Sequence, residues 1–246
     1  SPVGTTASLS EWLAEARPDL TFPREAGDRA DIDIAYCPER VLPGKIIQEL
    51  VENDRIIGGL SNQSTERATQ LYGLFVKGNV LRTNAITAEM CKLVENSFRD
   101  VNIAFANELS IICAEQGIDV WELIQLANHH PRVNILRPGP GVGGHCIAVD
   151  PWFIVHSSPE NARLIRTARE VNDAKPDFVV AEIMALANRF KTPRVACLGL
   201  SFKADIDDLR ESPAVSIVER LAEQDGIDIL VVEPHIETLP AQLAAG

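Results

Sequence analysis

The sequence predicts an α/β protein with a partial parallel sheet, a long helical centre and a second α/β unit. Short apolar strands alternate with helical segments over residues 1–85, which is the pattern of a parallel sheet with crossover helices. From Thr87 to Gln116 the chain lacks proline and apolar residues recur every three or four positions, as in a long amphipathic helix. After Pro193 a strand, a helix and another strand follow.

The first 85 residues supply the elements of the first sheet. A helix is predicted from Thr5 to Arg17, because apolar residues keep helical spacing until Pro18. Residues 31–36 alternate acidic and apolar side chains, which indicates a strand. Three more elements are expected: a strand at 56–57, a helix over 64–75 with Ser64 as its N-cap, and a strand at 80–81.

The centre of the chain is predicted to be helical. The helix over 87–116 should end at Gly117. At about 1.5 Å per residue it is roughly 45 Å long, so we expect it to bridge domains or subunits. Asp119 can cap a second helix over 120–128.

A third helix and a βαβ unit complete the prediction. The third helix is expected over 159–189, opened by Ser158 and Pro159, and Pro176 should kink or break it. The final unit combines a strand at 195–198, a helix over 213–223 that starts behind Ser212, and a strand at 227–232.

Composition argues against several classes of function and location for this protein. The net charge of −12 over 246 residues argues against non-specific binding of nucleic acid or of an anionic membrane surface. The five cysteines are dispersed without framework spacing, which favours a reducing cytosol and a cytoplasmic protein. No apolar run reaches the roughly 18 residues of a membrane span, and no signal peptide is recognised. The chain starts at Ser1 rather than Met, so we expect a processed or partial sequence.

The glycine-rich loop at residues 138–151 is the first candidate site. Its glycines and prolines exclude a helix or a regular strand, and it presents Cys146 between His145 and Asp150. One interpretation is a catalytic nucleophile beside backbone amides; the other is a tight turn with a buried, inert cysteine. No CxxC or HxxxH pair is present, so no metal is expected. We predict no dinucleotide-binding loop here, because no helix is predicted after the glycines.

Polar residues on the long helix and after a predicted strand each allow a functional and a structural interpretation. Lys92 and Asn96 share a helix face, with Asn107 at a similar azimuth. These side chains could polarise a carbonyl or hold an oxyanion, or they could form a solvated face. Glu39 follows a predicted strand and could act as a general base, or it could be a surface acid paired with Arg40.

Basic residues could bind an anionic ligand. Lys203 and Arg210 lie in the loop before the helix at 213–223, where a phosphate is favoured; the acids of the same loop could instead neutralise both. Arg132 and Arg137 flank the approach to the glycine loop and could hold a diphosphate, or they could be solvated.

Several separated segments resemble signatures of one known family. GVGGHCIAVDP resembles the catalytic-cysteine signature of the UDP-glucose/GDP-mannose dehydrogenase family. The likeness covers nearly the whole chain. It implies a partial Rossmann-like parallel sheet, a long central helical (dimerisation) region and the start of a second Rossmann-like domain. The other segments that carry the resemblance are SPVGTT, AYCPERVLPGK, AEMCKLVENSFRDVNIAFANE and LSFKADIDDLRESPA.

The resemblance also implies domain boundaries. Residues 1–85 would be the C-terminal part of an NAD-binding Rossmann-like domain. Residues 86–190 would be the central helical dimerisation domain with the catalytic loop. Residues 191–246 would begin the domain that binds the UDP-sugar.

The implied activity is an NAD-dependent, four-electron oxidation of a UDP-sugar, in the synthesis of bacterial surface polysaccharide. In the family a cysteine forms a thiohemiacetal with the aldehyde of the first step and a thioester in the second. By resemblance Cys146 is the nucleophile, Lys92 and Asn96 support the oxyanion and the water, and Asp150 assists proton movement. Glu39 matches the acid near the water and the cofactor.

The remaining implied contacts concern substrate, cofactor and partner. Lys203, Gly143 and Gly144 would contact the nucleotide sugar, Arg132 would reach the diphosphate from a neighbouring subunit, and Arg210 would contact NAD. The expected assembly is a homodimer through the central helix.

The first strand with its glycine loop, and most of the UDP-binding domain, have no counterpart in the sequence, so little turnover is expected from these 246 residues. The alternatives are an inactive dimerisation module and a dehydrogenase for another UDP-sugar.

Overall fold

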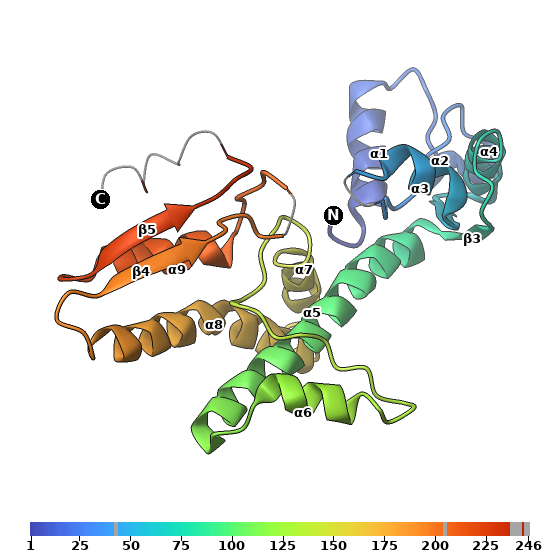
Figure 1. Ribbon diagram of the computed structural model, residues 1–246. Helices are drawn as coiled ribbons and strands as arrows, with labels where there is room; N and C mark the ends of the chain where they lie inside the picture. Colours follow the sequence, from blue (N-terminus) through green and yellow to red (C-terminus); the bar gives the residue numbers. More distant parts are fainter. Residues whose placement is uncertain (42–43, 204–205, 237–242, 244–246) are drawn as a thin grey trace. The chain divides into compact units, whose positions relative to one another are not determined.

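The computed structural model describes residues 1–41, 44–203, 206–236 and 243, which divide into two compact units, Ser1–Glu95 and Asn96–Gly246 (Figure 1). Helix α5 (Ala85–Gln116) begins in the first unit and ends in the second. Each unit contains a pair of parallel strands with helices between them, so the predicted α/β class is confirmed. No helix in the described ranges combines the length and the apolar character needed to cross a bilayer.

The first unit is built around a three-stranded sheet in the order β1-β2-β3. Strand β1 (Ala35–Tyr36) pairs antiparallel with β2 (Arg55–Gly59), and β2 pairs parallel with β3 (Val80–Asn84). Every residue of the central strand β2 is buried. The strand predicted over 31–36 is therefore present only at its end, and it runs against the other two.

The start of that predicted strand is a loop because its acidic side chains find local partners. The Asp31 carboxylate accepts hydrogen bonds from the backbone and the hydroxyl of Thr21, both at 2.8 Å. Such side-chain bonds compete with a strand ladder. The other described elements of the unit are α1 (Thr5–Ala16), α2 (Pro23–Ala26), the 3-10 turn η1 (Gly27–Arg29), α3 (Ile46–Glu52) and α4 (Asn62–Tyr72); α2 and α3 were not predicted.

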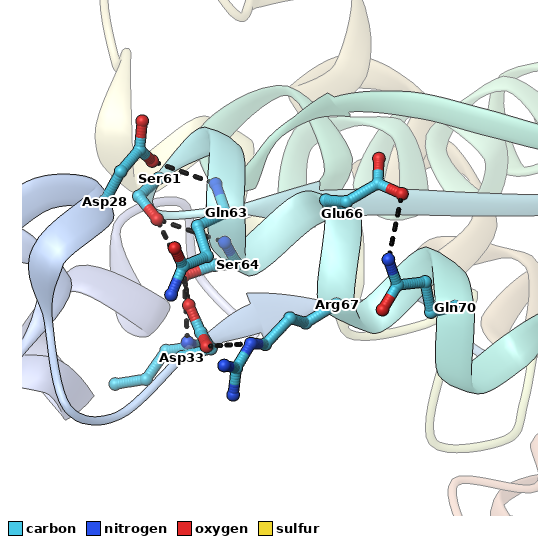
Figure 2. A network of polar contacts seen from close by, with 9 residues as sticks. Asp28, Asp33, Ser61, Gln63, Ser64, Glu66, Arg67 and Gln70 are labelled. Carbon is cyan, nitrogen blue, oxygen red and sulfur yellow. Dashed lines mark hydrogen bonds and ion pairs between the residues drawn. The ribbon is translucent and has the colours of Figure 1, made fainter.

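Helix α4 starts earlier than predicted, and Ser64 is not its N-cap (Figure 2). The cap is Ser61, whose hydroxyl accepts a hydrogen bond from the Ser64 amide at 3.1 Å. The hydroxyl of Ser64 is buried, donates to Asp33 and accepts from the backbone of Ile34, both at 3.2 Å. Ser64 therefore fastens the helix to the segment before β1.

The second unit begins with the predicted long helix. Helix α5 ends where Gly117 takes a positive φ of 68°, the backbone conformation that favours glycine after a helix. Asp119 then caps α6 (Val120–Ala127) by accepting from the amides of Trp121 and Glu122. Both of these predictions are confirmed.

The predicted third helix is present as α8 (Arg163–Ala187), and an unpredicted helix precedes it. Helix α7 (Asp150–Ser157) follows the glycine loop, and Ser158 is its C-cap rather than the start of a longer helix. Helix α8 begins later than predicted and continues through Pro176. A Cβ on Gly141 would lie 3.3 Å from the carbonyl oxygen of Asn172, which is the carbonyl that proline leaves without its helical donor. The glycine loop thus packs against the weak point of α8.

The predicted βαβ unit is confirmed. Strand β4 (Arg194–Leu198) pairs parallel with β5 (Asp228–Val232), and α9 (Pro213–Ala222) lies between them in the sequence. Buried Leu200, Val215 and Val218 form its core. Ser212 holds the cap position of α9, but its hydroxyl donates to the Leu200 carbonyl at 2.6 Å instead of capping the helix.

Candidate active site

The glycine loop presents a half-buried, free thiol at Cys146. The carbonyl of Cys146 accepts hydrogen bonds from the amides of Val149 at 3.1 Å and Asp150 at 2.8 Å, so a tight turn leads into α7. His145 beside it is exposed. Because the sulfur is neither in the packed core nor on an open surface, the geometry is compatible with a nucleophile.

The loop contains the spacing GxGxxG at Gly139, Gly141 and Gly144, which the sequence reading did not credit. A dinucleotide loop joins a strand directly to a helix. In the described structure no strand leads directly into these glycines, and α7 starts only at Asp150. The glycines therefore serve close packing, as the following contacts show.

Asn96 and Asp150 lie together in the interior of the second unit. The Asn96 side-chain amide donates to the Asp150 carboxylate at 2.5 Å, and both residues are buried. One comes from α5 and the other from the first turn of α7. Two of the predicted site residues are thus in contact, next to the turn that carries Cys146.

The glycine loop packs directly on the loop between β4 and α9. The Gly144 amide donates to the Arg210 carbonyl at 3.0 Å. A Cβ on Gly143 would lie 2.5 Å from the carbonyl oxygen of Glu211, and one on Gly144 would lie 2.9 Å from the ring of Phe202. Both positions therefore need glycine for contacts within the chain, whatever they contribute to substrate binding.

Arg210 lies within electrostatic range of Cys146. Its guanidinium forms a two-pronged ion pair with Asp208, with nitrogen–oxygen distances of 2.6 and 2.9 Å. This pairing raises the pKa of Arg210, and Cys146 contributes a smaller rise. The same pairing lowers the pKa of Asp208 to about 2, with a smaller effect from His145. Asp208 therefore neutralises Arg210, which agrees with one of the two interpretations for this residue only.

Lys203 is exposed in the loop between β4 and α9. The start of that loop is held in place by Glu233, a residue that the sequence analysis did not single out. Its carboxylate accepts from the amides of Leu200 at 2.7 Å, Ser201 at 3.1 Å and His235 at 3.0 Å. These amide donors lower the pKa of Glu233 to about 2. Its position directly after the strand β5 is the sequence signal that could have identified Glu233.

Glu39 lies in the first unit and has three donors. Its carboxylate accepts from the amides of Arg40 at 2.7 Å and Val41 at 3.1 Å, and from the guanidinium of Arg55 at 3.0 Å. Arg40 instead pairs with Glu95, so the interpretation of a Glu39–Arg40 surface pair is wrong. These three donors fix the position of the Glu39 carboxylate.

Arg55 is a residue that the sequence analysis missed. Its side chain is 2% exposed, and its guanidinium lies over the ring of Tyr72 at 5.6 Å from the centroid. The signal was present: an arginine inside a fully buried strand must find a counter-charge. Here that counter-charge is Glu39.

None of the contacts just described involves the remaining predicted cations of the site. Lys92 is partly buried on α5, one turn before Asn96, so the two side chains share a helix face. Arg132 is exposed in the turn after α6, and its amide donates to the ring nitrogen of His130 at 3.3 Å. Arg137 is exposed as well. The roles of Lys92 and Arg132 stay predictions.

Asn107 differs from both readings that the sequence allowed. It is fully buried and so does not lie on a solvated face, and both ends of its amide bond to other parts of the chain. Its amide donates to the Asn172 side chain at 2.8 Å and its oxygen accepts from the Gly139 amide at 2.8 Å. Among the described residues, no group of three or more histidines, cysteines or acids could hold a metal.

A buried ionic cluster joins α5 to α8. Asp100, with no exposed surface, accepts from Arg169 at 2.6 Å and from Asn172 at 2.8 Å. Burial raises the pKa of Asp100, and the Arg169 charge opposes that rise. One turn further along α8, Lys175 donates to Ser110 at 2.6 Å, and burial lowers its pKa. The sequence signal was a polar residue at every third position of one face of α8.

Comparison with known proteins identifies the family. The chain matches three models of the UDP-glucose/GDP-mannose dehydrogenase family: the NAD binding domain over residues 1–76, the central domain over 86–174 and the UDP binding domain over 196–245. The chain belongs to this family, as the sequence resemblance indicated. The match to the NAD binding domain also confirms a Rossmann-like fold.

Curated relatives have two different names. An NDP-N-acetyl-D-galactosaminuronic acid dehydrogenase of Ralstonia nicotianae is 66% identical over 243 residues, which are 99% of this chain and 57% of that protein. A UDP-N-acetyl-D-mannosamine dehydrogenase of Escherichia coli is 61% identical over 99% of this chain and 60% of that protein. The chain therefore spans less than two thirds of the length of these relatives.

The solved structures agree with these matches. A UDP-D-ManNAc dehydrogenase from Pyrococcus horikoshii is 41% identical and superposes with a TM-score of 0.84, over 96% of this chain and 56% of that one. An NDP-N-acetyl-D-galactosaminuronic acid dehydrogenase from Methanosarcina mazei gives a TM-score of 0.86 at 31% identity, over 98% of this chain and 53% of that one.

Proposed function

We propose that this chain takes part in the NAD-dependent, four-electron oxidation of UDP-N-acetyl-D-mannosamine to UDP-N-acetyl-D-mannosaminuronate, with Cys146 as the nucleophile. The observation that carries the proposal is the placement of one half-buried thiol beside the Asn96–Asp150 pair and within electrostatic range of Arg210. The identity of 61% with a relative of that name supports the substrate.

The chemistry follows from what a thiol can do. The first oxidation removes a hydride from C6 of the sugar and a proton from its hydroxyl, leaving an aldehyde. The sulfur of Cys146 adds to the aldehyde carbon to give a thiohemiacetal, and loss of a second hydride and a proton gives a thioester. Water then replaces the sulfur, releases the carboxylate and restores the thiol. A thiol suits both roles, because sulfur adds readily and also leaves readily from an acyl group.

The side chains of Asn96 and Asp150 can each assist these reaction steps. Asn96 has a second amide hydrogen besides the one donated to Asp150. That hydrogen could stabilise an oxyanion formed at the Cys146 adduct. The Asp150 carboxylate can accept a proton from water or hydroxyl. We propose that Lys92, on the same face of α5 as Asn96, adds positive charge to the oxyanion, and that Glu39 serves near the water and the cofactor.

The described residues fit part of an NAD molecule. A polar cavity of about 580 Å3 lies at the carboxyl ends of β2 and β3, with Gly59, Ser61, Thr65 and Asn84 among its lining residues. Ligands of α/β sheets bind at this edge. When bound, NAD supplies the hydride acceptor. No glycine-rich loop here joins a strand directly to a helix, so these residues do not build a diphosphate cradle of that kind.

Substrate recognition is assigned to the basic residues. We propose that Lys203, Gly143 and Gly144 contact the nucleotide sugar, that Arg132 reaches its diphosphate from a neighbouring subunit, and that Arg210 serves the cofactor. The curated relatives carry names for two different N-acetylated sugars. A dehydrogenase for another UDP-sugar is therefore the second candidate, and substrate comparison decides between them.

A protection experiment tests the proposed site without requiring turnover. UDP-N-acetyl-D-mannosamine should slow the alkylation of Cys146 by iodoacetamide, because a bound sugar would cover the sulfur. At saturating ligand we expect protection of about tenfold or more. Peptide mass spectrometry after partial alkylation reports each of the five cysteines separately.

Cys197 serves as the internal control of this experiment. Its thiol is half-buried in β4, and burial raises its pKa, so its slow alkylation should not respond to the sugar. Equal protection of both cysteines would indicate a global effect. Unchanged alkylation of Cys146, at sugar concentrations that titration calorimetry shows to be bound, would refute the assignment.

We also propose that the protein forms a homodimer through α5. Three apolar side chains at a spacing of seven residues remain exposed on its second-unit part: Phe98 at 68%, Phe105 at 54% and Ile112 at 39%. A seven-residue apolar repeat is the pattern that pairs one helix with another. The same surface supports the alternative function of a dimerisation module without catalysis.

Replacing Phe98 by glutamate should weaken this dimer. A charge placed within an apolar helix contact must be desolvated, so we expect the dissociation constant to rise about thirtyfold or more. Analytical ultracentrifugation over a concentration series measures it. Ala114→Glu, an exposed position on the other side of the same helix, adds the same charge and should have little effect. A dimer that tolerates Phe98→Glu would exclude this interface.

A further inference from the structure

Two asparagine side chains of α5 hold the two ends of the cysteine loop. At the start of the loop, the oxygen of Asn107 accepts from the Gly139 amide at 2.8 Å. At its end, the amide of Asn96 donates to Asp150 at 2.5 Å. Both asparagines belong to one helix, about three turns apart. The stretch with Cys146 therefore lies between two fixed points on one rigid element.

The anchor at Asn107 is itself fixed from behind. Its amide donates to Asn172 at 2.8 Å, and the amide of Asn172 donates to Asp100 at 2.8 Å. Asp100 also accepts from Arg169. All four side chains are at least 99% buried. A buried chain of hydrogen bonds resists rearrangement, because each broken bond leaves a polar group without water or partner.

The fixed anchor matters because the loop has few backbone hydrogen bonds of its own before Gly144. Residues 133–139 have neither helical nor strand structure. Gly141 packs between Asn172 and Pro213, where an added Cβ would lie 2.9 Å from the Pro213 side chain. A change at Asn107 would therefore shift the loop relative to α8 and α9, and with it the approach to Cys146.

We propose that Asn107 is a positioning residue for the Cys146 thiol: it fixes the start of the glycine loop through the Gly139 amide and so sets the surroundings of the sulfur. The proposal rests on the proposed function of Cys146 as the nucleophile. Asn107 touches neither the sulfur nor a substrate in this arrangement, and its role is exerted through the loop backbone. Uniform weakening of the fold would not produce a selective change at Cys146.

The test compares Asn107→Ala with Asn102→Ala. Asn102 lies on the same helix, and in the described part of the chain its amide donates along that helix, to the Phe98 carbonyl at 2.6 Å. In Asn107→Ala, hydrogen–deuterium exchange of the peptide with Gly139 should become about tenfold faster, because its amide loses its acceptor. The rate of Cys146 alkylation as a function of pH should also change, by about threefold or more at neutral pH.

The outcomes separate this inference from the proposed function. Loss of protection at Gly139 together with a changed Cys146 profile supports the inference, provided that Cys197 and the Asn102→Ala variant stay unchanged. A folded Asn107→Ala protein with parental exchange at Gly139 and a parental Cys146 profile would overturn it. Both readouts are made without substrate, so they hold whether or not the sugar protects Cys146.

A second variant covers the case in which Asn107→Ala does not fold. Asn107→Asp keeps the side-chain volume and the oxygen that accepts from Gly139, and in its protonated form, which burial favours and in which it is to be measured, its O–H can still donate to Asn172. We expect exchange of the Gly139 peptide and the Cys146 alkylation profile to remain within about twofold of the parent, as a conservative rescue should. Fast exchange at Gly139 in a folded Asn107→Asp protein would show that the asparagine oxygen does not hold the loop, and would overturn the inference.

Discussion

Replacing Cys146 by serine, in a chain extended to the full length of the matched relatives, is expected to lower uronate formation by at least about a thousandfold, because a hydroxyl is a far weaker nucleophile than a thiolate near neutral pH. The first hydride transfer does not use the sulfur, so some aldehyde could still form. The yield should then fall from two molecules of NADH per sugar towards one. Mass spectrometry of the sugar nucleotide, together with NADH absorbance, measures both.

Cys197→Ser is the matched control for this substitution. Cys197 lies in β4 and packs against the core of the βαβ unit, away from the glycine loop in sequence. The variant should keep its uronate yield per folded molecule. Full uronate formation by Cys146→Ser would remove the basis of the proposed mechanism, and an equal loss in both variants would point to a folding defect.

Replacing Arg169 by methionine is expected to destabilise the second unit by about 3–5 kcal/mol, because it leaves the Asp100 carboxylate buried without its cation. Asp100 has no exposed surface and Arg169 is 1% exposed. Urea unfolding followed by circular dichroism gives the free energy of unfolding. Arg169 also contacts Asp173, which is half exposed and can be solvated by water instead.

The exposed pair Arg194–Asp228 provides the comparison. Its side chains are 76% and 59% exposed, so Arg194→Met should change the free energy of unfolding by about 1 kcal/mol or less. The double variant Asp100→Leu with Arg169→Met should recover part of the loss, because no unpaired charge is left behind. A loss in Arg169→Met no larger than in Arg194→Met would mean that the buried pair is not needed for stability.

Local signals predicted most of the fold. The long helix ending at Gly117, the Asp119 cap and the final βαβ unit all depend on residues close in the sequence, and each is confirmed. The errors occur where a partner distant in sequence decides. Ser64 resembles an N-cap, but Asp33 and Ile34 use its hydroxyl. Residues 31–36 have the alternation of a strand, but the Asp31 carboxylate accepts a hydrogen bond from Thr21, and the segment begins as a loop.

In the candidate site, too, local patterns were predictable and contacts between distant segments were not. The glycine run identified the loop with Cys146, and helical spacing placed Asn96 and Asn107 on one face of α5. No local pattern could show that Asn107 would be buried against Asn172 and Gly139, since those contacts join three separate segments. Arg55 was missed for a similar reason, because its partner Glu39 belongs to the loop after β1.

The spacing of the two asparagines on α5 has a consequence for sequence length. Each residue added to an α-helix turns the following side chains by about 100° and advances them by about 1.5 Å. A single insertion between Asn96 and Asn107 would aim one amide away from the loop that the other still reaches. This part of the chain should therefore tolerate exchanges of surface side chains far better than any gain or loss of a residue.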